Sequence, residues 1–442
     1  MKIIKSHSGM RGIYGESLTP DLTYAIAKSY AENFQPETVI VGRDTRPSGK
    51  IIKQTIIAGL TSSGVNVIDV DIAPTPAILY AIKHYEADGG IIISASHNPP
   101  EWNALKFAGK GGLLLTSPEI SKILENINKK SATTKIGKII RKNIINLYIK
   151  ELTKHANTEN IKKAGFKVVV DSGGGAGALT TPLLLTKLGC KVITINSIPG
   201  LFTRKIEPTG KALEILKTTV QASNADIGFA HDCDADRLAC VDEKGNIIRE
   251  DYGIGVAVKQ VVTQKKAKGI VVNIASSLIF DHIANESQTP IFRSKVGEAN
   301  VVRKIIETNS DVGAEGSSGG LILREFHLAR DGAIAALKIL EAMAERNMKF
   351  SELIKELPSY HIEKLNLPYS PNKIKKIEEK ICKNWKNYTI ESIDGIRING
   401  EEWWILIRPS RTEPLLRIMV EAREKNKAKE IMRKIIKTIQ ED

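Results

Sequence analysis

The chain lacks the sequence features of membrane, secreted and cysteine-rich proteins. None of its apolar runs approaches the roughly 18 residues that a membrane-spanning helix needs. The N-terminal segment has no apolar stretch long enough for a secretory signal peptide. The four cysteines form no Cys-x-x-Cys pair and have no histidine-rich segment as partner, which argues against a zinc site or a disulfide framework. We therefore expect a cytoplasmic protein without a membrane partner.

Aromatic residues are also scarce, at 5% of the chain, and this bears on how its positive charge is interpreted. A net charge of +14 is compatible with nucleic-acid binding, but the basic residues are spread along the chain and are densest in residues 373–386 and 423–437. Aromatic residues do not alternate with them as a platform for stacking bases requires. We predict solvated helix faces and no nucleic-acid partner, and the charge surplus favours an anionic substrate.

The chain contains enough apolar residues for more than one hydrophobic core. It has 442 residues, 42% of them apolar, and a single core stops growing at about 250–300 residues. One pattern occurs three times: an apolar strand, a turn of small or polar residues, a helix and a second strand, as in a β-α-β unit. The three units begin with strands at residues 39–41, 168–170 and 270–272. They predict three α/β domains of similar build.

The end of the chain follows another pattern. After Pro358 we expect a helix over residues 372–384, two short strands, longer strands at residues 404–407 and 417–422, and a basic closing helix. This order predicts a small α+β domain. We divide the chain into three α/β domains, residues 1–147, 148–247 and 248–361, and a C-terminal α+β domain, residues 362–442.

The first candidate site is the turn Ser-Ala-Ser-His-Asn-Pro-Pro at residues 94–100, directly after an apolar strand. Its two prolines prevent an ordinary helix start or a continued strand, so Ser96 and His97 are expected on a rigid, exposed turn. A serine beside a histidine can act as a nucleophile or can store a phosphoryl group. The alternative is a turn in which Asn98 and the prolines have only structural roles.

The second candidate site is a run of alternating aspartates, Asp232, Asp234 and Asp236, which follows the apolar-rich residues 227–230. Three such carboxylates in a loop can converge on one hard cation such as Mg²⁺. Without a cation or a basic partner they would repel one another. Arg237 beside them can hold a phosphate oxygen through two hydrogen bonds. An exposed acidic turn is the alternative, but sites in α/β proteins form where apolar strands end.

Two further segments offer groups for a phosphorylated sugar. Residues 408–414 combine two arginines, two hydroxyl groups and a tight loop, which can cradle a dianion, although a surface turn has the same composition. In the glycine-rich residues 313–320, Glu315 and two serines can bind sugar hydroxyls, and glycine allows close approach. This segment is not a dinucleotide fingerprint, because the required helix and ribose-binding acid do not follow it.

The four segments together, in this order, resemble those of the α-D-phosphohexomutase family, which includes phosphoglucomutases, phosphomannomutases and phosphoglucosamine mutases. The resemblance covers nearly the whole chain, and residues 41–46, 74–76, 207–209 and 330–332 also resemble family stretches. It implies a four-domain, heart-shaped α/β enzyme with three related α/β domains, a C-terminal α+β domain and an active site in the central cleft.

The resemblance also implies a reaction. Ser96 would carry the phosphoryl group and bind Mg²⁺ together with Asp232, Asp234 and Asp236. The phosphoserine would donate its group to a hexose monophosphate, and the other phosphoryl group of the resulting bisphosphate would return to Ser96. Glucose 1,6-bisphosphate, or the matching hexose bisphosphate, would then be an activator. Such phosphoryl transfer depends mainly on positioning and charge neutralisation.

The remaining site residues follow from the same resemblance. Arg11 and Lys106 match residues thought to assist proton transfer at the sugar hydroxyl. His97 either has a related role in this transfer or orients its loop. Because a lysine is a base only when its pKa is lowered, we expect a neighbouring arginine to lower the pKa of Lys106. Substrate contacts are assigned to Arg237, Lys295, Glu298, Glu315, Ser317, Ser318, Arg408, Ser410, Arg411, Thr412 and Arg417.

Four positions depart from the family pattern. Cys233 and Ala104 stand where glycine is common, Arg411 where glycine or asparagine is usual, and Gly320 where histidine is common. We expect metal binding to survive Cys233, because the spacing of the carboxylates is unchanged. The glycine-rich segment resembles that of archaeal members, which as a group often accept several sugars. The sequence leaves open glucose, mannose or glucosamine, and a monomer or a homodimer.

Two other classes of protein are weighed against the mutase. A phosphatase of the haloacid dehalogenase type also places aspartates after a strand, but it uses the first aspartate as nucleophile and releases the phosphoryl group to water. The separate turn with Ser96 and His97 favours the mutase. A basic nucleic-acid-binding protein would show an affinity that falls steeply with salt.

Overall fold

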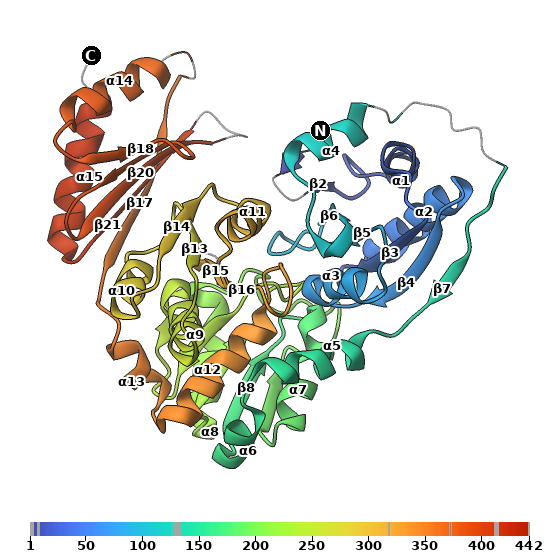
Figure 1. The fold of residues 1–442 in the computed structure, drawn as a ribbon, viewed down its shortest axis with the longest axis horizontal. Helices are drawn as coiled ribbons and strands as arrows, with labels where there is room; N and C mark the ends of the chain where they lie inside the picture. The colour runs from blue at the N-terminus through green and yellow to red at the C-terminus, as the bar shows by residue number, and fades with distance from the viewer. Residues whose placement is uncertain are drawn as a thin grey trace.

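The computed structural model describes residues 4–6, 9–125, 127, 134–316, 319–370, 372, 374–410 and 415–440. Within these residues the strands form four sheets, which follow one another along an arc from the N-terminal to the C-terminal end (Figure 1). We call each sheet with its helices a domain, numbered I to IV. The expected fold, three α/β domains and a C-terminal α+β domain, is confirmed, whereas the residue limits we gave these domains stay predictions.

Domain I is built on a seven-stranded sheet in the order β1-β2-β6-β5-β3-β4-β7. Its central strands are buried runs rich in Val and Ile, as expected where helices cover both faces. Its elements are β1 (Ile4–Ser6), β2 (Gly9–Ile13), α1 (Pro20–Phe34), β3 (Thr38–Arg43), α2 (Gly49–Ser62), β4 (Asn66–Ile72), α3 (Thr75–His84), β5 (Gly89–Ile93), β6 (Trp102–Gly109), η1 (Lys110–Gly112), α4 (Ser117–Glu125) and β7 (Ile139–Arg141).

Domain II has a five-stranded sheet in the order β12-β11-β10-β8-β9. The chain enters it through α5 (Ile145–Leu152), η2 (Thr153–His155) and α6 (Thr158–Ala164). Its elements are β8 (Lys167–Asp171), η3 (Ala176–Leu179), α7 (Thr181–Lys187), β9 (Lys191–Ile195), η4 (Gly210–Leu213), α8 (Glu214–Ser223), β10 (Ile227–Ala230), β11 (Ala239–Asp242) and β12 (Ile247–Ile248).

Domain III has a four-stranded sheet in the order β14-β13-β15-β16. Helix α12 begins where Asp331 accepts the amides of Ala333 and Ile334, which is a usual N-cap. The elements are α9 (Glu250–Gln264), β13 (Ile270–Asn273), α10 (Ile279–Glu286), β14 (Ile291–Ser294), α11 (Glu298–Thr308), β15 (Val312–Glu315), β16 (Gly320–Leu323), α12 (Gly332–Arg346) and α13 (Phe350–Lys355).

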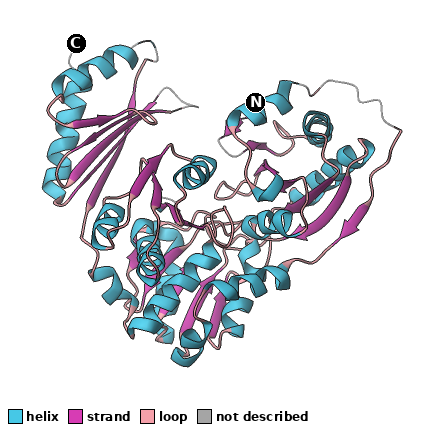
Figure 2. Cartoon of the chain, in the orientation of Figure 1, coloured by secondary structure: helices cyan, strands magenta, loops and turns pink. Residues whose placement is uncertain are grey.

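Domain IV is an antiparallel sheet in the order β17-β21-β20-β19-β18, with its helices along one face (Figure 2). Helix α15 buries Ala428, Ile431, Met432 and Ile435, a spacing that places them on one helical stripe. The elements are β17 (His361–Pro368), α14 (Ile374–Asn384), β18 (Thr389–Glu391), β19 (Ile396–Asn399), β20 (Trp403–Pro409), β21 (Leu415–Ala422) and α15 (Lys425–Gln440).

Domains I, II and III share one arrangement of four strands, which confirms the predicted repeat. In each, the first strand pairs in parallel with two neighbours, and a fourth strand then pairs antiparallel with the second neighbour. The order is β4-β3-β5-β6 in domain I, β9-β8-β10-β11 in domain II and β14-β13-β15-β16 in domain III. The connection between the last two of these strands carries Ser96 in domain I and the three aspartates in domain II, and in domain III its described residues are Gly316 and Gly319.

Apolar packing links domains I to III more extensively than it links domain IV to them. One apolar cluster runs through domains I to III and includes Ile78, Leu184 and Phe280. Domain IV has a core of its own around Trp385. It meets domain III through a smaller cluster that includes Trp404. No helix in the described part of the chain has the length and apolar character needed to cross a membrane.

Candidate active site

Ser96 lies at the centre of the site in an uncommon backbone conformation. Its φ of 49° is in the left-handed region, which residues other than glycine seldom adopt. Its Oγ donates a hydrogen bond to Oδ2 of Asp232 over 2.6 Å, so the turns of domains I and II meet here. The amide of Ser96 donates to Oγ of Ser94 at 3.0 Å. The turn therefore aims the hydroxyl group at the acidic loop of domain II.

The three aspartates of that loop form a group with the geometry of a cation site. Asp232, Asp234 and Asp236 are buried, and each offers one carboxylate oxygen within 4.8 Å of the others. The Oδ1 atom of each is buried and has no hydrogen-bond partner among the described residues. Burial, and then repulsion from Asp236 and Asp234, raise the pKa of Asp232 well above its usual range. Unpartnered, hard oxygen atoms under mutual repulsion fit Mg²⁺.

Lys106 lies against these carboxylates, which overturns one expectation. Its Nζ is 2.6 Å from Oδ2 of Asp234 and 3.5 Å from Oδ2 of Asp236. Burial acts to lower the pKa of Lys106, but the two carboxylates and Glu298 raise it above its ordinary value. The prediction that a neighbouring arginine lowers the pKa of Lys106 is therefore wrong. In this state the lysine is an ammonium group that neutralises acid, not a base.

Whereas Lys106 lies among negative charges, His97 lies near positive ones. Its Nδ1 is 3.5 Å from Oγ of Ser96. Burial, and then the positive charges of Arg237, Arg330 and Arg11, lower the pKa of His97 to about 3. The imidazole is therefore neutral near pH 7, and because burial and the arginines disfavour its protonated form, it is a weak base that can accept a hydrogen bond through an unprotonated ring nitrogen.

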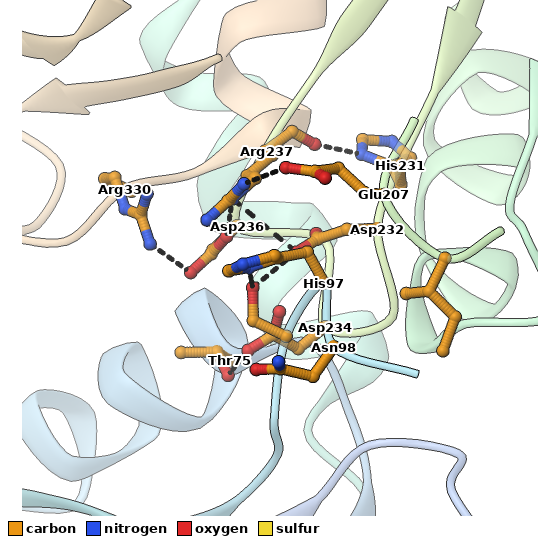
Figure 3. Close-up of polar contacts among 12 residues, drawn as sticks. Thr75, His97, Asn98, Glu207, His231, Asp232, Asp234, Asp236, Arg237 and Arg330 are labelled. Atoms are coloured by element: carbon orange, nitrogen blue, oxygen red, sulfur yellow. Dashed lines mark hydrogen bonds and ion pairs between the residues drawn. The ribbon is translucent and has the colours of Figure 1, made fainter. Parts of the chain in front are cut away.

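Two arginines approach the acidic group, and a third lines the cavity beside it. Arg237 points toward the aspartates in Figure 3, with its Nε 3.8 Å from Oδ2 of Asp232 and 3.7 Å from Oδ1 of Asp236. Arg330 reaches in from domain III and donates to Oδ2 of Asp236 over 2.7 Å. Arg11 donates to Oδ1 of Asn98 over 3.2 Å. The three aspartates thus lie beside positively charged side chains that can bind a phosphate ester.

A cavity of about 280 Å³ opens in front of Ser96. It brings together predicted residues from domains I, II and III, namely Arg11, Ser96, His97, Lys106, Arg237, Glu298 and Glu315. The Glu315 carboxylate accepts from the amide of Gly297 at 2.7 Å and from Nδ2 of Asn273 at 3.2 Å, and it pairs with Arg330 at 3.1 Å. Lys295 instead lines a neighbouring cavity of about 230 Å³.

Of the predicted phosphate residues of domain IV, the described ones, Arg408, Ser410 and Arg417, do not line this cavity. Arg408 pairs with Asp394 at 3.0 Å, and Arg417 lies opposite Arg408 in the pairing of β20 with β21. The Oγ of Ser410 is buried and has no hydrogen-bond partner in the described part of the chain. Burial, and then the charge of Arg417 in domain IV, lower the pKa of Arg11 in domain I. Ser317, Ser318, Arg411 and Thr412 fall outside the described residues.

Sequence reasoning assigned no role to three residues that shape the site. Arg330 joins Asp236 to Glu298, with its Nε 3.1 Å from Oε2 of that glutamate. Thr75 donates to Oδ2 of Asp234 over 2.6 Å. Arg46 binds carbonyl groups of the Ser96 turn. Each of the three lies in a stretch that resembles the family, and this resemblance was the signal from which a role could have been predicted.

Two of the departures from the family pattern have structural explanations. The buried Sγ of Cys233 lies 3.5 Å from Oγ1 of Thr45. Burial first, and then Asp44, raise the pKa of this thiol, so it is a neutral packing group rather than a ligand. At Gly320, a Cβ atom would come within 2.4 Å of Cδ of Arg330. Glycine therefore leaves room for the arginine that reaches Asp236.

Comparison with known proteins agrees with this geometry. Models of phosphoglucomutase/phosphomannomutase alpha/beta/alpha domains I, II and III and of the C-terminal domain match residues 2–134, 146–245, 249–360 and 364–438. A phosphoglucomutase/phosphomannomutase of Thermococcus kodakarensis is 39% identical, over 98% of this chain and 97% of the relative. A probable phosphoglucosamine mutase of the same organism is also 39% identical, over 97% and 96%.

Among solved structures, a phosphoglucomutase/phosphomannomutase family protein of Burkholderia thailandensis has the same fold. It superposes with a TM-score of 0.89 at 24% identity, covering 98% of this chain and 97% of the other. The fold and the site together define an enzyme of phosphoryl transfer. The chain belongs to the phosphoglucomutase/phosphomannomutase family, as the resemblance implied, and it is an isomerase of the phosphohexomutase superfamily.

Proposed function

We propose that the chain interconverts the 1-phosphate and 6-phosphate of glucose and mannose through a phosphorylated Ser96. The observation that carries this proposal is the 2.6 Å hydrogen bond from Oγ of Ser96 to Asp232, one of three buried aspartates with unpartnered oxygens. A hydroxyl group beside a cation site is where a phosphoryl group can be held and its charge neutralised.

The reaction consists of two transfers in opposite directions. In the first, a sugar hydroxyl oxygen bonds to phosphorus as the bond from phosphorus to Oγ of Ser96 breaks, and the proton that the sugar hydroxyl loses balances the proton that Oγ of Ser96 gains. In the second, Ser96 attacks the other phosphate of the sugar bisphosphate. The proton lost by the attacking hydroxyl group needs an acceptor, and Oδ2 of Asp232, at 2.6 Å, and Nδ1 of His97, at 3.5 Å, both lie near Oγ of Ser96.

The surrounding residues have separate tasks. Asp232, Asp234 and Asp236 would hold Mg²⁺, which when bound offsets the negative charge of the transferring phosphoryl group. Lys106 and Arg330 balance the aspartates and line the cavity. Arg408, Ser410 and Arg417 on domain IV, with Arg411 and Thr412, would hold the phosphate that does not react. A hexose bisphosphate would restore phosphoserine whenever the intermediate escapes.

A second candidate substrate is glucosamine phosphate. One of the two relatives at 39% identity is named a probable phosphoglucosamine mutase, and the other a phosphoglucomutase/phosphomannomutase. The test compares kcat/KM for the 1-phosphates of glucose, mannose and glucosamine, with Mg²⁺ and a trace of glucose 1,6-bisphosphate. We expect turnover that Ser96→Ala reduces by at least about a thousandfold. Absence of turnover with all three sugars, or full activity of Ser96→Ala, would overturn the proposal.

A further inference from the structure

Arg46 uses its entire hydrogen-bonding capacity inside the protein. Its side chain is fully buried. Its Nε donates to Oδ2 of Asp44 over 3.0 Å. The two terminal nitrogens donate to four carbonyl oxygens, those of Ser96 at 2.7 Å, Asn98 at 2.6 Å, Pro99 at 2.5 Å and Trp102 at 3.1 Å. A guanidinium group has five N–H donors, so every one of them is engaged.

Three of these carbonyl groups belong to the turn that presents Ser96, and the fourth is that of Trp102, the first residue of β6. They converge on one point, where the planar fork of donors of a guanidinium group can bind all four at once. Asp44 fixes the guanidinium from the other side, because its Oδ1 also accepts the amide of Arg46 at 2.9 Å. The arrangement therefore supports the left-handed backbone at Ser96, a conformation that surrounding contacts must hold.

The same segment touches the acidic loop of domain II. The Oγ1 of Thr45 donates to the carbonyl of Gly174 over 2.7 Å and lies 3.5 Å from Sγ of Cys233. The carbonyl of Cys233 in turn accepts the amide of Ala176 at 2.8 Å. Three consecutive residues, Asp44, Thr45 and Arg46, thus contact both turns that meet at the hydrogen bond between Ser96 and Asp232.

We propose that Arg46 is a positioning residue for phosphoryl transfer, which together with Asp44 holds the Ser96 turn in register with the three aspartates. This inference deepens the proposed function and rests on it. Arg46 does not line the cavity, so it acts through the backbone of the turn and not on the sugar. Its loss is expected to slow transfer to and from Ser96 while leaving substrate binding largely intact.

The test is Arg46→Lys, which keeps the charge but has three donors on a tetrahedral nitrogen and cannot satisfy four carbonyl groups. We expect kcat to fall on the order of 100-fold, because small errors in the alignment of reacting atoms have effects of this size. The KM for the hexose phosphate should change by less than about threefold. The rate of Ser96 phosphorylation by glucose 1,6-bisphosphate, followed by mass spectrometry, should fall in parallel with kcat.

A matched control separates positioning from general stability. Arg397 is also fully buried, and its guanidinium donates to the carbonyl of Ile274. Arg397→Lys should lower the melting temperature without slowing the phosphorylation of Ser96. If Arg46→Lys does not fold, Asp44→Asn replaces it, since it leaves the arginine in place without its ionic partner, and about a tenfold loss in kcat is expected.

The outcomes distinguish this inference from the proposed function. Wild-type protein that is never phosphorylated at Ser96 by the bisphosphate contradicts the proposed function itself. Wild-type protein that is phosphorylated and active, together with an Arg46→Lys or Asp44→Asn variant whose kcat stays within about threefold, overturns only the positioning role. A loss confined to KM, with normal phosphorylation of Ser96, overturns it as well.

Discussion

Around Ser96, single charged residues are balanced against one another at short range. Three buried carboxylates lie together, and Lys106, Arg237 and Arg330 approach them from domains I, II and III. Each Oδ1 atom of the aspartates nevertheless has no hydrogen-bond partner among the described residues. The basic residues therefore compensate the charge only in part, and the remaining oxygen atoms suit a divalent cation.

Binding of Mg²⁺ should stabilise the folded protein through these aspartates. A ligand that binds only the folded state at 100 times its Kd adds about 2.7 kcal/mol of stability. We expect Mg²⁺ to raise the melting temperature of the wild type by several degrees, and Asp232→Asn to lose most of this rise. Asp21→Asn, on the exposed first turn of α1, is the control and should keep it. An equal rise in the Asp232→Asn variant would place the cation elsewhere.

Cys233 is expected to be replaceable although it stands between two of the aspartates. Its thiol is buried toward Thr45, and its raised pKa keeps it neutral. Cys233→Ala should therefore bind Mn²⁺, used as a spectroscopic substitute for Mg²⁺, within about twofold of the wild-type Kd. Titration followed by electron paramagnetic resonance checks this, and a tenfold weaker Kd would show that the thiol supports the site.

At this scale the sequence predicts the reactive groups better than their charge states. Ser96 and the aspartates follow apolar strands and could be singled out from pattern alone. The charge state of Lys106 could not, because it depends on Asp234 and Asp236, which lie far away in the sequence. The role of Arg46 could not be predicted either, since its partners are backbone carbonyls that only the folded turn brings together.

At the scale of secondary-structure elements, domains I, II and III carry their predicted site residues at the same position of a repeated unit. The turn between the third and fourth strand of the common four-stranded unit carries Ser96 in domain I, the aspartates in domain II and the glycine-rich segment in domain III. The repeated β-α-β units were predictable from the alternation of apolar and polar residues. The antiparallel fourth strand was not, because strand pairing across a sheet leaves little trace in a single sequence.

The N-terminal end of α9 contains a carboxyl group whose ionisation should weaken the fold. Burial, opposed by Arg249 and reinforced by Glu421, raises the pKa of Asp251 to about 6. The folded chain thus holds this proton more tightly than the unfolded chain, whose aspartate titrates near 3.8. The stabilising contribution is complete below about pH 4 and is lost as the pH rises through about 6.

Asp251→Asn should remove this pH dependence. The asparagine still offers an oxygen to the amide of Ser277, which Asp251 now accepts at 3.3 Å. We expect the melting temperature of the wild type to fall relative to that of the variant between pH 4 and pH 6, measured by differential scanning calorimetry in low salt. Parallel pH curves for the two proteins would contradict the assigned pKa of Asp251.

At the scale of the whole molecule, domains I to III share one core and domain IV is attached to them through a smaller contact. Glu421 is the polar centre of that contact. It is fully buried and accepts from Nε1 of Trp404 at 2.9 Å, from the amide of Leu278 at 2.8 Å and from Arg249 at 2.8 Å. Separate cores joined in this way allow domain IV to move as a unit.

Glu421→Gln should weaken the seating of domain IV. It removes one of the two carboxylates that pair with Arg249, the one that belongs to domain IV, while Asp251 of domain III stays 3.5 Å away. Because domain IV carries Arg408 and Ser410, we expect the KM for the hexose phosphate to rise more than kcat falls. Glu424→Gln, an exposed neighbour in the same domain, should change neither. A fall in kcat at constant KM would contradict this role for domain IV.

The most direct test of the account follows a phosphoryl group in a single turnover. Protein carrying ³²P on Ser96, prepared with labelled glucose 1,6-bisphosphate, is mixed with glucose 1-phosphate and Mg²⁺, and the products are separated. We predict that the label leaves Ser96 for a sugar bisphosphate and then appears in the hexose monophosphate pool, with little inorganic phosphate. Release of the label mainly as inorganic phosphate, or label held on a residue other than Ser96, would contradict the account.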